Sequence, residues 1–253
     1  MYPILFKWGT FLVPAWHTFF LLGALASFVA FRRLTMKYQP KLLTCVGPVY
    51  FYGYLGGLVG ARLLSIVVEE DDPNLTQMMS LDSFTLFGGV LGGFAFASLY
   101  VWFKNLPFAK LWDLAVPSFL LGLAIGRIGC FLNGDDYGIE VFPDAEGKFP
   151  WWAVVFPNHP VMVPRVPVQL VEAGGVAILF VLIVVMFKRV QKLGKGLVGS
   201  LSLAAYCGLR FCLEFLRGDP RGFFFGTALS TSQGIAIAIF LMLAGVWSWR
   251  ASH

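Results

Sequence analysis

Charged side chains that lie within long apolar stretches are the groups in this sequence most suited to chemistry. Arg127 follows the apolar run Pro117–Ile125 and is separated from it by Gly126 alone. Arg210, Glu214 and Arg217 lie in another apolar stretch at positions i, i+4 and i+7, a spacing that predicts one shared helix face. Guanidinium groups stay protonated when buried and contact phosphate through paired N–H donors. The pattern predicts either an Arg–Glu–Arg ion network that satisfies itself or a clamp in which Glu214 orients arginines around a phosphate.

The elements that must position these groups have the composition of membrane-spanning helices. Of the 253 residues, 58% are hydrophobic and 13% are charged, whereas a soluble domain carries about 25% charged residues. Several apolar runs reach the roughly 20 residues that a helix needs to cross a bilayer. The sequence therefore predicts an all-α polytopic membrane protein. We expect seven transmembrane helices, at about Val13–Phe31, Cys45–Val68, Phe84–Phe103, Leu111–Leu132, Val166–Phe187, Gly196–Leu216 and Ala228–Trp249.

Lysine and arginine are distributed unevenly between the two sides of these spans. The loops after the first, third, fifth and seventh spans hold eleven of the 19, whereas the N-terminus and the remaining loops hold five. Because the side rich in basic residues is cytoplasmic, we expect the N-terminus outside and the C-terminus in the cytoplasm. Residues 1–253 then form a single membrane domain, with 134–165 as a small insertion on the outer side. This topology also accounts for the net charge of +5 without a nucleic-acid partner.

Polar groups within the spans concentrate, under this topology, toward the outer side of the membrane. A charged group at the centre of a bilayer costs at least about 2.5–3.5 kcal/mol, so such residues usually mark function. The three arginines within the spans outnumber the two glutamates, which favours an anionic ligand in an outward-facing polar cavity. The four cysteines lack metal-ligand spacing, so we expect neither a metal site nor a cofactor. The polar and interfacial groups concerned are Trp16, His17, Arg62, Arg127, Gln169, Glu172, Arg210, Glu214, Arg217 and Gln233.

Glycines recur four residues apart within three of the spans. The pairs are Gly56 with Gly60, Gly89 with Gly93, and Gly122 with Gly126. Small residues at this spacing let helix backbones approach closely in lipid. The pattern predicts tight helix packing.

The stretch around Arg127 resembles the signature of the prolipoprotein diacylglyceryl transferases of bacterial inner membranes. That signature reads Gly-Arg-x-Gly-Asn-Phe-x-Asn-x-Glu-x-x-Gly, and its matching residues here are Gly126, Arg127, Gly129, Phe131, Asn133 and Gly138. Further likeness, in family order along the chain, is carried by Gly88, Gly89, Asp113, the run Pro167–Glu172, the run Arg210–Arg217 and Gln233. The resemblance covers nearly the whole chain.

The resemblance implies a multi-pass enzyme of the bacterial inner membrane that acts in lipoprotein biogenesis. Such an enzyme moves diacylglyceryl from phosphatidylglycerol to the lipobox cysteine thiol of a preprolipoprotein, and glycerol phosphate leaves. Residues 134–165 would then be periplasmic, and the partners would be phosphatidylglycerol, the lipobox peptide and membrane lipids. The implied catalytic residues are Arg127, Arg210, Glu214 and Asp135. The implied head-group ligands are Arg127, Arg210, Arg217, Asn133, Gly138, Gln169 and Glu172.

The chain departs from the family pattern at four positions. Phe87 occupies the place of a family histidine that is a proposed proton acceptor, Cys130 replaces the signature Asn, Asp135 replaces the signature Glu, and Trp16 occupies a usual tyrosine position. The proton acceptor for the thiol would be Asp135, Glu214 or His17, unless the thiol arrives already ionised. The alternative is a divergent paralogue that binds phospholipid or lipoprotein with altered or lost transferase activity. Transfer to another nucleophile also stays open, whereas the absence of an inverted repeat disfavours a transporter.

Overall fold

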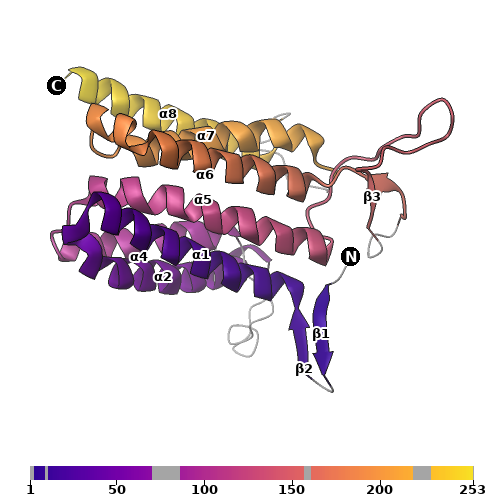
Figure 1. Ribbon diagram of the computed structural model, residues 1–253, viewed down its shortest axis with the longest axis horizontal. Coiled ribbons are helices and arrows are strands. Elements are labelled where there is room, and N and C mark those ends of the chain that lie inside the picture. Colours follow the sequence, from indigo (N-terminus) through magenta and orange to yellow (C-terminus); the bar gives the residue numbers. More distant parts are fainter. Residues whose placement is uncertain (1–2, 9–10, 70–85, 157–160, 219–228, 253) are drawn as a thin grey trace. The chain divides into compact units, whose positions relative to one another are not determined.

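The computed structural model describes residues 3–8, 11–69, 86–156, 161–218 and 229–252, and helices dominate it (Figure 1). Two short 3-10 turns lie at Pro40–Leu42 (η1) and Glu214–Leu216 (η2). The α-helices are α1 (Ala15–Tyr38), α2 (Leu43–Glu69), α4 (Leu86–Phe103), α5 (Phe108–Asn133), α6 (Val168–Leu193), α7 (Leu197–Leu213) and α8 (Thr231–Ser252).

The helices confirm the expected all-α polytopic membrane protein. Among the described residues, six helical segments are long and apolar enough to cross a membrane, and the shorter apolar segment Gly88–Phe103 lies in α4. Each of the seven expected spans overlaps a helix, and most of the helices run past the predicted C-terminal end. The helix α4 ends at the predicted Phe103, whereas α7 ends at Leu213 and η2 continues it to Leu216. The expected starts of the third and seventh spans, at residues 84 and 228, lie outside the described residues.

The described chain falls into two compact units. One comprises residues 1–30 and 112–253, and the other comprises residues 31–111. The expectation of one domain over 1–253, with an insertion at 134–165, stays a prediction.

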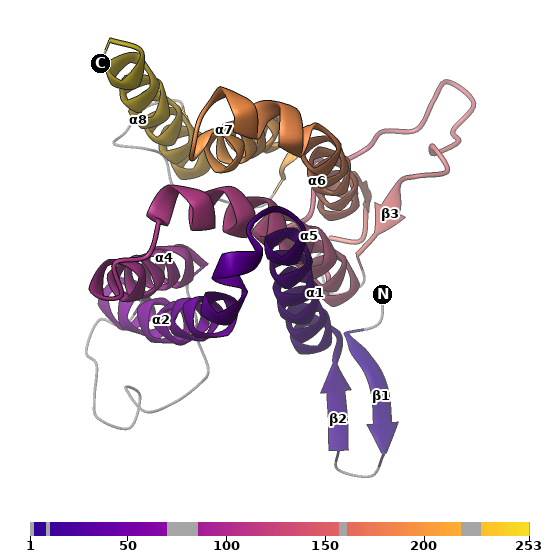
Figure 2. The same ribbon diagram turned by 60° about the vertical axis from the view of Figure 1, so that its left-hand side comes forward.

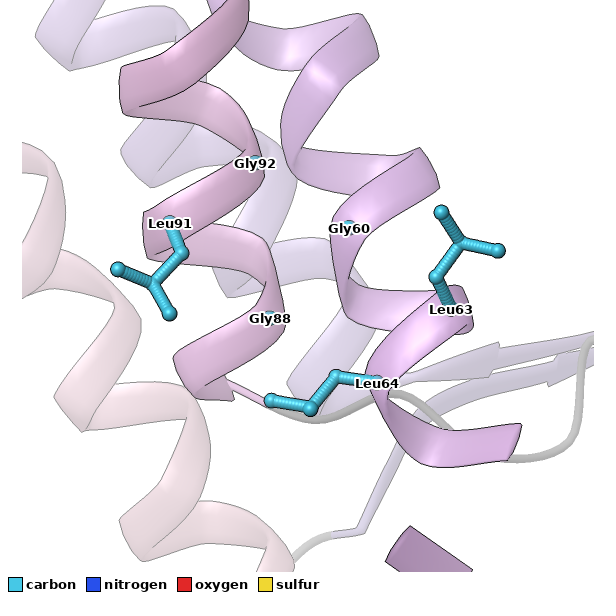
Figure 3. Close-up of a pocket in the computed structure, with 6 residues that line it drawn as sticks. All are labelled: Gly60, Leu63, Leu64, Gly88, Leu91 and Gly92. Carbon is cyan, nitrogen blue, oxygen red and sulfur yellow. The ribbon is translucent and has the colours of Figure 1, made fainter. Parts of the chain in front are cut away.

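Glycine contacts hold α2 against α4 in the unit of residues 31–111. Gly60 faces Gly88 and Gly92, and Gly56 faces Gly92 one turn along, so the two helices run antiparallel (Figure 3). A Cβ added at Gly60 would lie 2.8 Å from the Cα atom of Gly92 and would overlap the carbonyl oxygen of Gly88. This close approach confirms the tight packing predicted from the Gly56–Gly60 pair, whereas a Cβ at Gly126, in another predicted pair, would meet nothing within 4 Å. Leu64 and Leu91 flank the glycines and help to line an apolar groove of about 270 Å³.

The other unit is organised around α5, α6 and α7. Leu120 and Ala124 of α5 form a buried cluster with Val176 of α6, and Tyr206 and Leu209 of α7 pack on it. Figure 2 shows α6 beside α7 and α7 beside α8.

Hydrogen bonds and glycines fix the ends and crossings of these helices. The carboxylate of Asp113, near the start of α5, accepts hydrogen bonds from the backbone N–H groups of Gly196 and Gly199, at 2.8 and 2.9 Å, and so caps the start of α7. Gly122 of α5 packs on Gly23 of α1, where a Cβ on either residue would overlap the other backbone.

Two small antiparallel hairpins were not expected from the sequence. The first pairs β1 (Ile4–Trp8) with β2 (Phe11–Pro14), and it leads directly into α1 (Figure 2). The second pairs β3 (Val154–Val155) with β4 (Pro164–Arg165) just before α6. Strands this short give too little periodicity to be recognised beside long apolar runs.

The α2–α4 contact generates a stability prediction. Gly60→Ala should lower the free energy of unfolding by about 1–3 kcal/mol, because the added methyl group forces the helix backbones apart. Gly47→Ala, in the same helix, is the matched control, since a Cβ at Gly47 meets nothing within 4 Å. Thermal unfolding in detergent micelles measures both variants. Equal unfolding temperatures for the two would contradict the packing described here.

Candidate functional site

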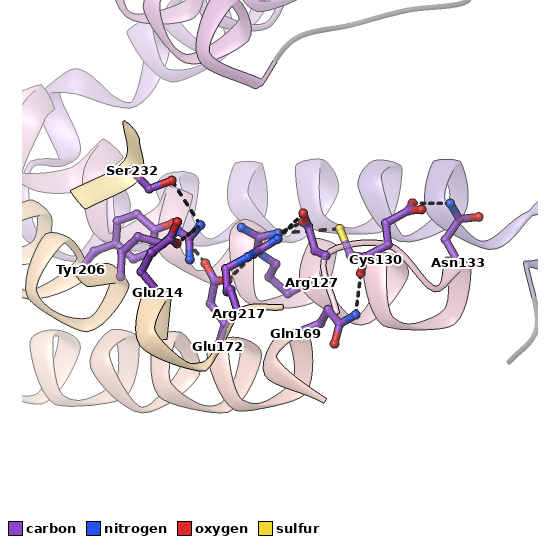
Figure 4. A network of polar contacts seen from close by, with 12 residues as sticks. Arg127, Cys130, Asn133, Gln169, Glu172, Tyr206, Glu214, Arg217 and Ser232 are labelled. Carbon is purple, nitrogen blue, oxygen red and sulfur yellow. Dashed lines mark hydrogen bonds and ion pairs between the residues drawn. The ribbon is translucent and has the colours of Figure 1, made fainter. Parts of the chain in front are cut away.

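Arg127 lies near the end of α5 and is buried between two carboxylates. Its Nη1 atom donates to Asp136 Oδ2 at 2.6 Å, and its Nε atom lies 3.0 Å from Glu172 Oε2. The Glu172 contact is a close ion pair without hydrogen-bond alignment, because neither of its two atoms has a hydrogen-bond partner. The thiol of Cys130, one turn further along α5, is 4.0 Å from the same Nη1 atom. Arg127 is thus the centre of a charged cluster (Figure 4).

Asp136 joins α5 to the end of the α7 segment. One of its carboxylate oxygens accepts from Arg127, and the other accepts from Nη2 of Arg217. Asp136 has φ +61°, in the left-handed region that Asp and Asn tolerate better than most residues. It follows Gly134, at φ +91°, in the turn after α5. The turn geometry therefore presents this carboxylate to both arginines.

Glu172, on α6, contacts one residue on α5 and one on α7, and so links the three helices. Its side chain is completely buried, and besides facing Arg127 it accepts a hydrogen bond from the Tyr206 hydroxyl at 3.2 Å. A buried carboxylate is tolerable in an apolar surrounding when it is paired and hydrogen-bonded. Glu172 meets that condition through residues on two other helices.

Arg210 forms the other end of the cluster. Its Nη2 atom lies 2.9 Å from Glu214 Oε2 and 3.4 Å from the Ser232 hydroxyl. Its Nη1 atom is buried and has no hydrogen-bond partner among the described residues. Buried donors are normally satisfied, so an oxygen ligand would suit this N–H group.

Gly138 brings together three segments that hold Arg217 in place. Its N–H donates to the Val166 carbonyl at 3.0 Å, and Ile139 N donates to the Leu216 carbonyl at 2.9 Å. A Cβ at Gly138 would lie 2.5 Å from the Val166 oxygen and 2.8 Å from the Leu216 oxygen. Only glycine fits between these backbones. Its predicted contact with the lipid head group is untested, and what the structure gives it is this packing role.

Arg217 is not on the helix face that the sequence spacing predicted. The helix ends at Leu213, a 3-10 turn follows, and Arg217 has extended backbone angles, φ −85° and ψ 140°. Arg210 and Glu214 do form the expected i, i+4 pair. Arg217 instead contacts Asp136 in the turn after α5. The motif therefore joins the network through two separate contacts, one made by Arg217 and one made within the Arg210–Glu214 pair.

The network is balanced in charge, contrary to the surplus of arginine expected from the spans. Three arginines, Arg127, Arg210 and Arg217, contact three carboxylates, Asp136, Glu172 and Glu214. The expectation counted only residues within the spans, so it included Arg62 and left out both Arg217 and Asp136. An anionic ligand would therefore have to compete with carboxylates already present.

The segment after α5 places the other predicted residues at the edge of this cluster. Asp135 is exposed, and its carboxylate accepts a hydrogen bond from the Asn133 amide instead of an arginine. The Asp135 carbonyl oxygen accepts from Gln169 Nε2, which is buried at the start of α6. Asp136 and Tyr206 were missed. Nothing in the sequence favours Asp136 over the adjacent Asp135. Nothing in it singles out Tyr206 within an apolar run either.

The remaining sequence candidates fall at different places. Trp16 packs beside Gly129, where a Cβ would lie 3.5 Å from the Trp16 Cα atom, and His17 is exposed. Gln233 and Ser230 exchange hydrogen bonds at the start of α8, at 3.1 and 3.2 Å, in a capping arrangement. Phe87 lies in the first turn of α4, and its side chain is outside the described part of the structure.

Arg62 is the other charged residue expected within a span. It lies on α2, where its Nη1 atom contacts the Ser65 hydroxyl at 3.2 Å. Arg62 belongs to the unit of residues 31–111, so its expected share in an outward-facing cavity stays a prediction.

The burial of Glu172 generates a second stability prediction. Glu172→Gln should lower the free energy of unfolding by about 3–5 kcal/mol, because it removes one partner from a buried ion pair. The control is Glu146→Gln, which removes the same charge from a pair with Lys148 in which both side chains are at least 72% exposed. That change should stay within about 1 kcal/mol of wild type. Chemical unfolding in mixed micelles compares them, and a neutral effect of Glu172→Gln would contradict the network.

Comparison with known proteins places this chain in a family. A model of the family described as prolipoprotein diacylglyceryl transferase matches residues 3–249. A protein named phosphatidylglycerol–prolipoprotein diacylglyceryl transferase from Clostridium tetani (strain Massachusetts / E88) is 31% identical over 256 residues, which cover 98% of this chain and 96% of that protein. Proteins of the same name from Burkholderia cenocepacia (strain HI2424) and Dechloromonas aromatica (strain RCB) are 29% and 28% identical, over 98% and 96% of this chain and 95% and 92% of their own lengths. The chain belongs to the prolipoprotein diacylglyceryl transferase family.

Proposed function

We propose that this protein is a phosphatidylglycerol–prolipoprotein diacylglyceryl transferase. The family match and the names of its relatives support this assignment. The observation that carries it is the buried guanidinium of Arg210, which pairs with Glu214 through Nη2 and leaves its Nη1 donor without a hydrogen-bond partner among the described residues. A guanidinium donor in an apolar surrounding suits a phosphate oxygen.

The proposed reaction exchanges one bond to carbon for another. The sulfur of the acceptor cysteine attacks the glyceryl carbon that bears the phosphate, so a C–S bond forms and the C–O bond to phosphate breaks. The electron pair of that bond leaves with the oxygen, and glycerol phosphate departs. The thiol proton passes to a base. The protein's main task is then to stabilise the charge that develops on the departing phosphate.

The arginines divide this task in the proposed mechanism. Arg210 supplies the unpaired donor to the phosphate, while Glu214 holds its other nitrogen and fixes the plane of the guanidinium. Arg127 and Arg217 add positive charge from the other side of the network, held by Glu172 and Asp136. Gln169 contributes by tying the turn that carries Asp136 to α6 through its bond to the Asp135 carbonyl.

Asp135 is the proton acceptor that fits the proposed reaction best. Its carboxylate is exposed and makes no ion pair among the described residues, and it accepts from Asn133. Glu214 is buried against Arg210, where taking up a proton would leave the arginine uncompensated. His17 is exposed at the start of α1 and is the alternative acceptor.

The proposed setting is the bacterial inner membrane with the N-terminus outside. The excess of basic residues in the loops after the first, third, fifth and seventh spans supports this orientation. It would put residues 134–165, and the end of α5 that carries Arg127, toward the periplasm, where a lipobox peptide would arrive.

A second candidate function is binding without turnover. Phe87 favours it, because a phenyl ring cannot accept a proton where the family has a histidine. Such a protein would hold phosphatidylglycerol or a lipoprotein with the same arginines and release no glycerol phosphate.

The transferase assignment predicts a mass gain on a lipobox peptide. Purified protein in phosphatidylglycerol vesicles should add one diacylglyceryl group, read by mass spectrometry. Arg210→Lys keeps the charge but loses the planar donor pair, so the rate should fall by about 10²–10³-fold. Arg189→Ala, an exposed arginine near the other end of α6, is the charge control and should keep the wild-type rate. An undiminished rate in Arg210→Lys would exclude this residue as a phosphate ligand, and binding of the lipid with no mass gain would select the second candidate.

The proposed orientation predicts which side of the membrane each loop occupies. A cysteine introduced as Glu146→Cys should react with an impermeant maleimide in spheroplasts, because residue 146 lies in the 134–165 segment. Lys192→Cys, in the last turn of α6, should react only after permeabilisation. The unmodified protein gives the background from its own four cysteines. Labelling of residue 192 in sealed spheroplasts would show that the proposed orientation is wrong.

A further inference from the structure

The carboxylate of Asp136 accepts hydrogen bonds from guanidinium N–H groups that could also bind a phosphate. Its two carboxylate oxygens each accept from a different guanidinium, one from Arg127 and one from Arg217. The arginine side chains are 7% and 2% exposed, whereas the Asp136 side chain is 29% exposed. The carboxylate therefore lies on the more accessible side of two buried cations.

Carboxylate and phosphate compete for the same N–H groups. Both present two acceptor oxygens to a guanidinium, and both form charge-assisted hydrogen bonds. A phosphate that accepts from Arg127 Nη1 or Arg217 Nη2 must displace or share an oxygen of Asp136. Arg127 would keep one counter-charge during that exchange, because Glu172 lies at its Nε atom and not at Nη1.

The main chain on either side of Asp136 is held by contacts that do not involve its carboxylate. Asp136 and Gly134 both have positive φ, in the turn between the end of α5 and the Gly138 junction. The turn is anchored at each end, by Gln169 at the Asp135 carbonyl and by Gly138 at Val166. Asp136 lies between these anchors, and neither anchor contact uses its side chain, so a rotation of the carboxylate would leave both contacts in place.

We propose that Asp136 is an internal competitor for phosphate, which sets the affinity of the site for the departing glycerol phosphate. This inference rests on the proposed function. Glycerol phosphate is a monoester and carries more negative charge than the phosphodiester of the donor lipid. Three arginines alone would therefore hold the product more tightly than the substrate. The return of the Asp136 carboxylate to Arg127 and Arg217 offsets that preference and releases the product.

The test compares glycerol phosphate binding in two charge-matched variants. Asp136→Asn removes the competing charge, and Asn tolerates the left-handed backbone, so the turn is preserved. Glu146→Gln removes the same charge from a carboxylate that is 72% exposed and pairs with Lys148, away from the arginine cluster. Calorimetry on the full-length protein in phosphatidylcholine nanodiscs, titrated with sn-glycerol 1-phosphate, should show about tenfold tighter binding for Asp136→Asn, the gain expected when one charged competitor is lost. Glu146→Gln should bind as wild type does.

Further titrations distinguish the possible phosphate ligands, and a second variant controls for misfolding. Glycerol should not bind, inorganic phosphate should bind more weakly than glycerol phosphate, and nanodiscs that contain phosphatidylglycerol should lower the apparent affinity for added glycerol phosphate. Asp136→Gly, which also accepts positive φ, repeats the test if the Asn variant unfolds at a lower temperature. Unchanged or weaker binding in folded Asp136 variants overturns the inference, as does a failure of glycerol phosphate to bind to any of the proteins. Intact binding with no mass gain on the lipobox peptide overturns the proposed function alone.

Discussion

The neutralisation of buried arginines is the constraint on which the site depends. An unpaired guanidinium in a bilayer costs several kcal/mol, so each of the three must find a carboxylate within reach. Arg127 on α5 finds Glu172 on α6, and Arg217 after α7 finds Asp136 after α5. These pairs join three helices and one turn into a single charged cluster. Because every member has a partner elsewhere in the chain, the loss of one leaves another uncompensated.

Close packing of the helix backbones brings these side chains within contact distance of one another. Gly138 lets the turn after α5 approach both the start of α6 and the end of the α7 segment, and Gly129 lets α1 lie against α5 at the level of the cluster. Asp113 fixes the start of α7 and thereby its register against α5. The arginines occupy fixed positions because the glycines and the helix cap hold their helices.

The sequence allowed a good prediction of the helices and a partial one of the site. Apolar runs about as long as a bilayer is thick predict helices directly, and all seven expected spans overlap helices. Buried charges predicted that Arg127 and the Arg210–Arg217 run would matter, because their burial is costly. The resemblance implied Asp135 as a catalytic residue, whereas the carboxylate that contacts Arg127 and Arg217 is that of Asp136. The positive φ that presents Asp136 to the arginines leaves no trace in the sequence pattern. Arg217 was placed on a helix face because nothing in the spacing indicates that α7 ends at Leu213.

The central claim is that the buried arginines form the phosphate site for the donor lipid. An experimental structure of the protein in phosphatidylglycerol nanodiscs tests it most directly. We expect head-group phosphate density within hydrogen-bond distance of Arg210 Nη1, with the pair between Arg127 and Glu172 retained. Phosphate density bound elsewhere, with Arg210 Nη1 paired to a protein group, would contradict it.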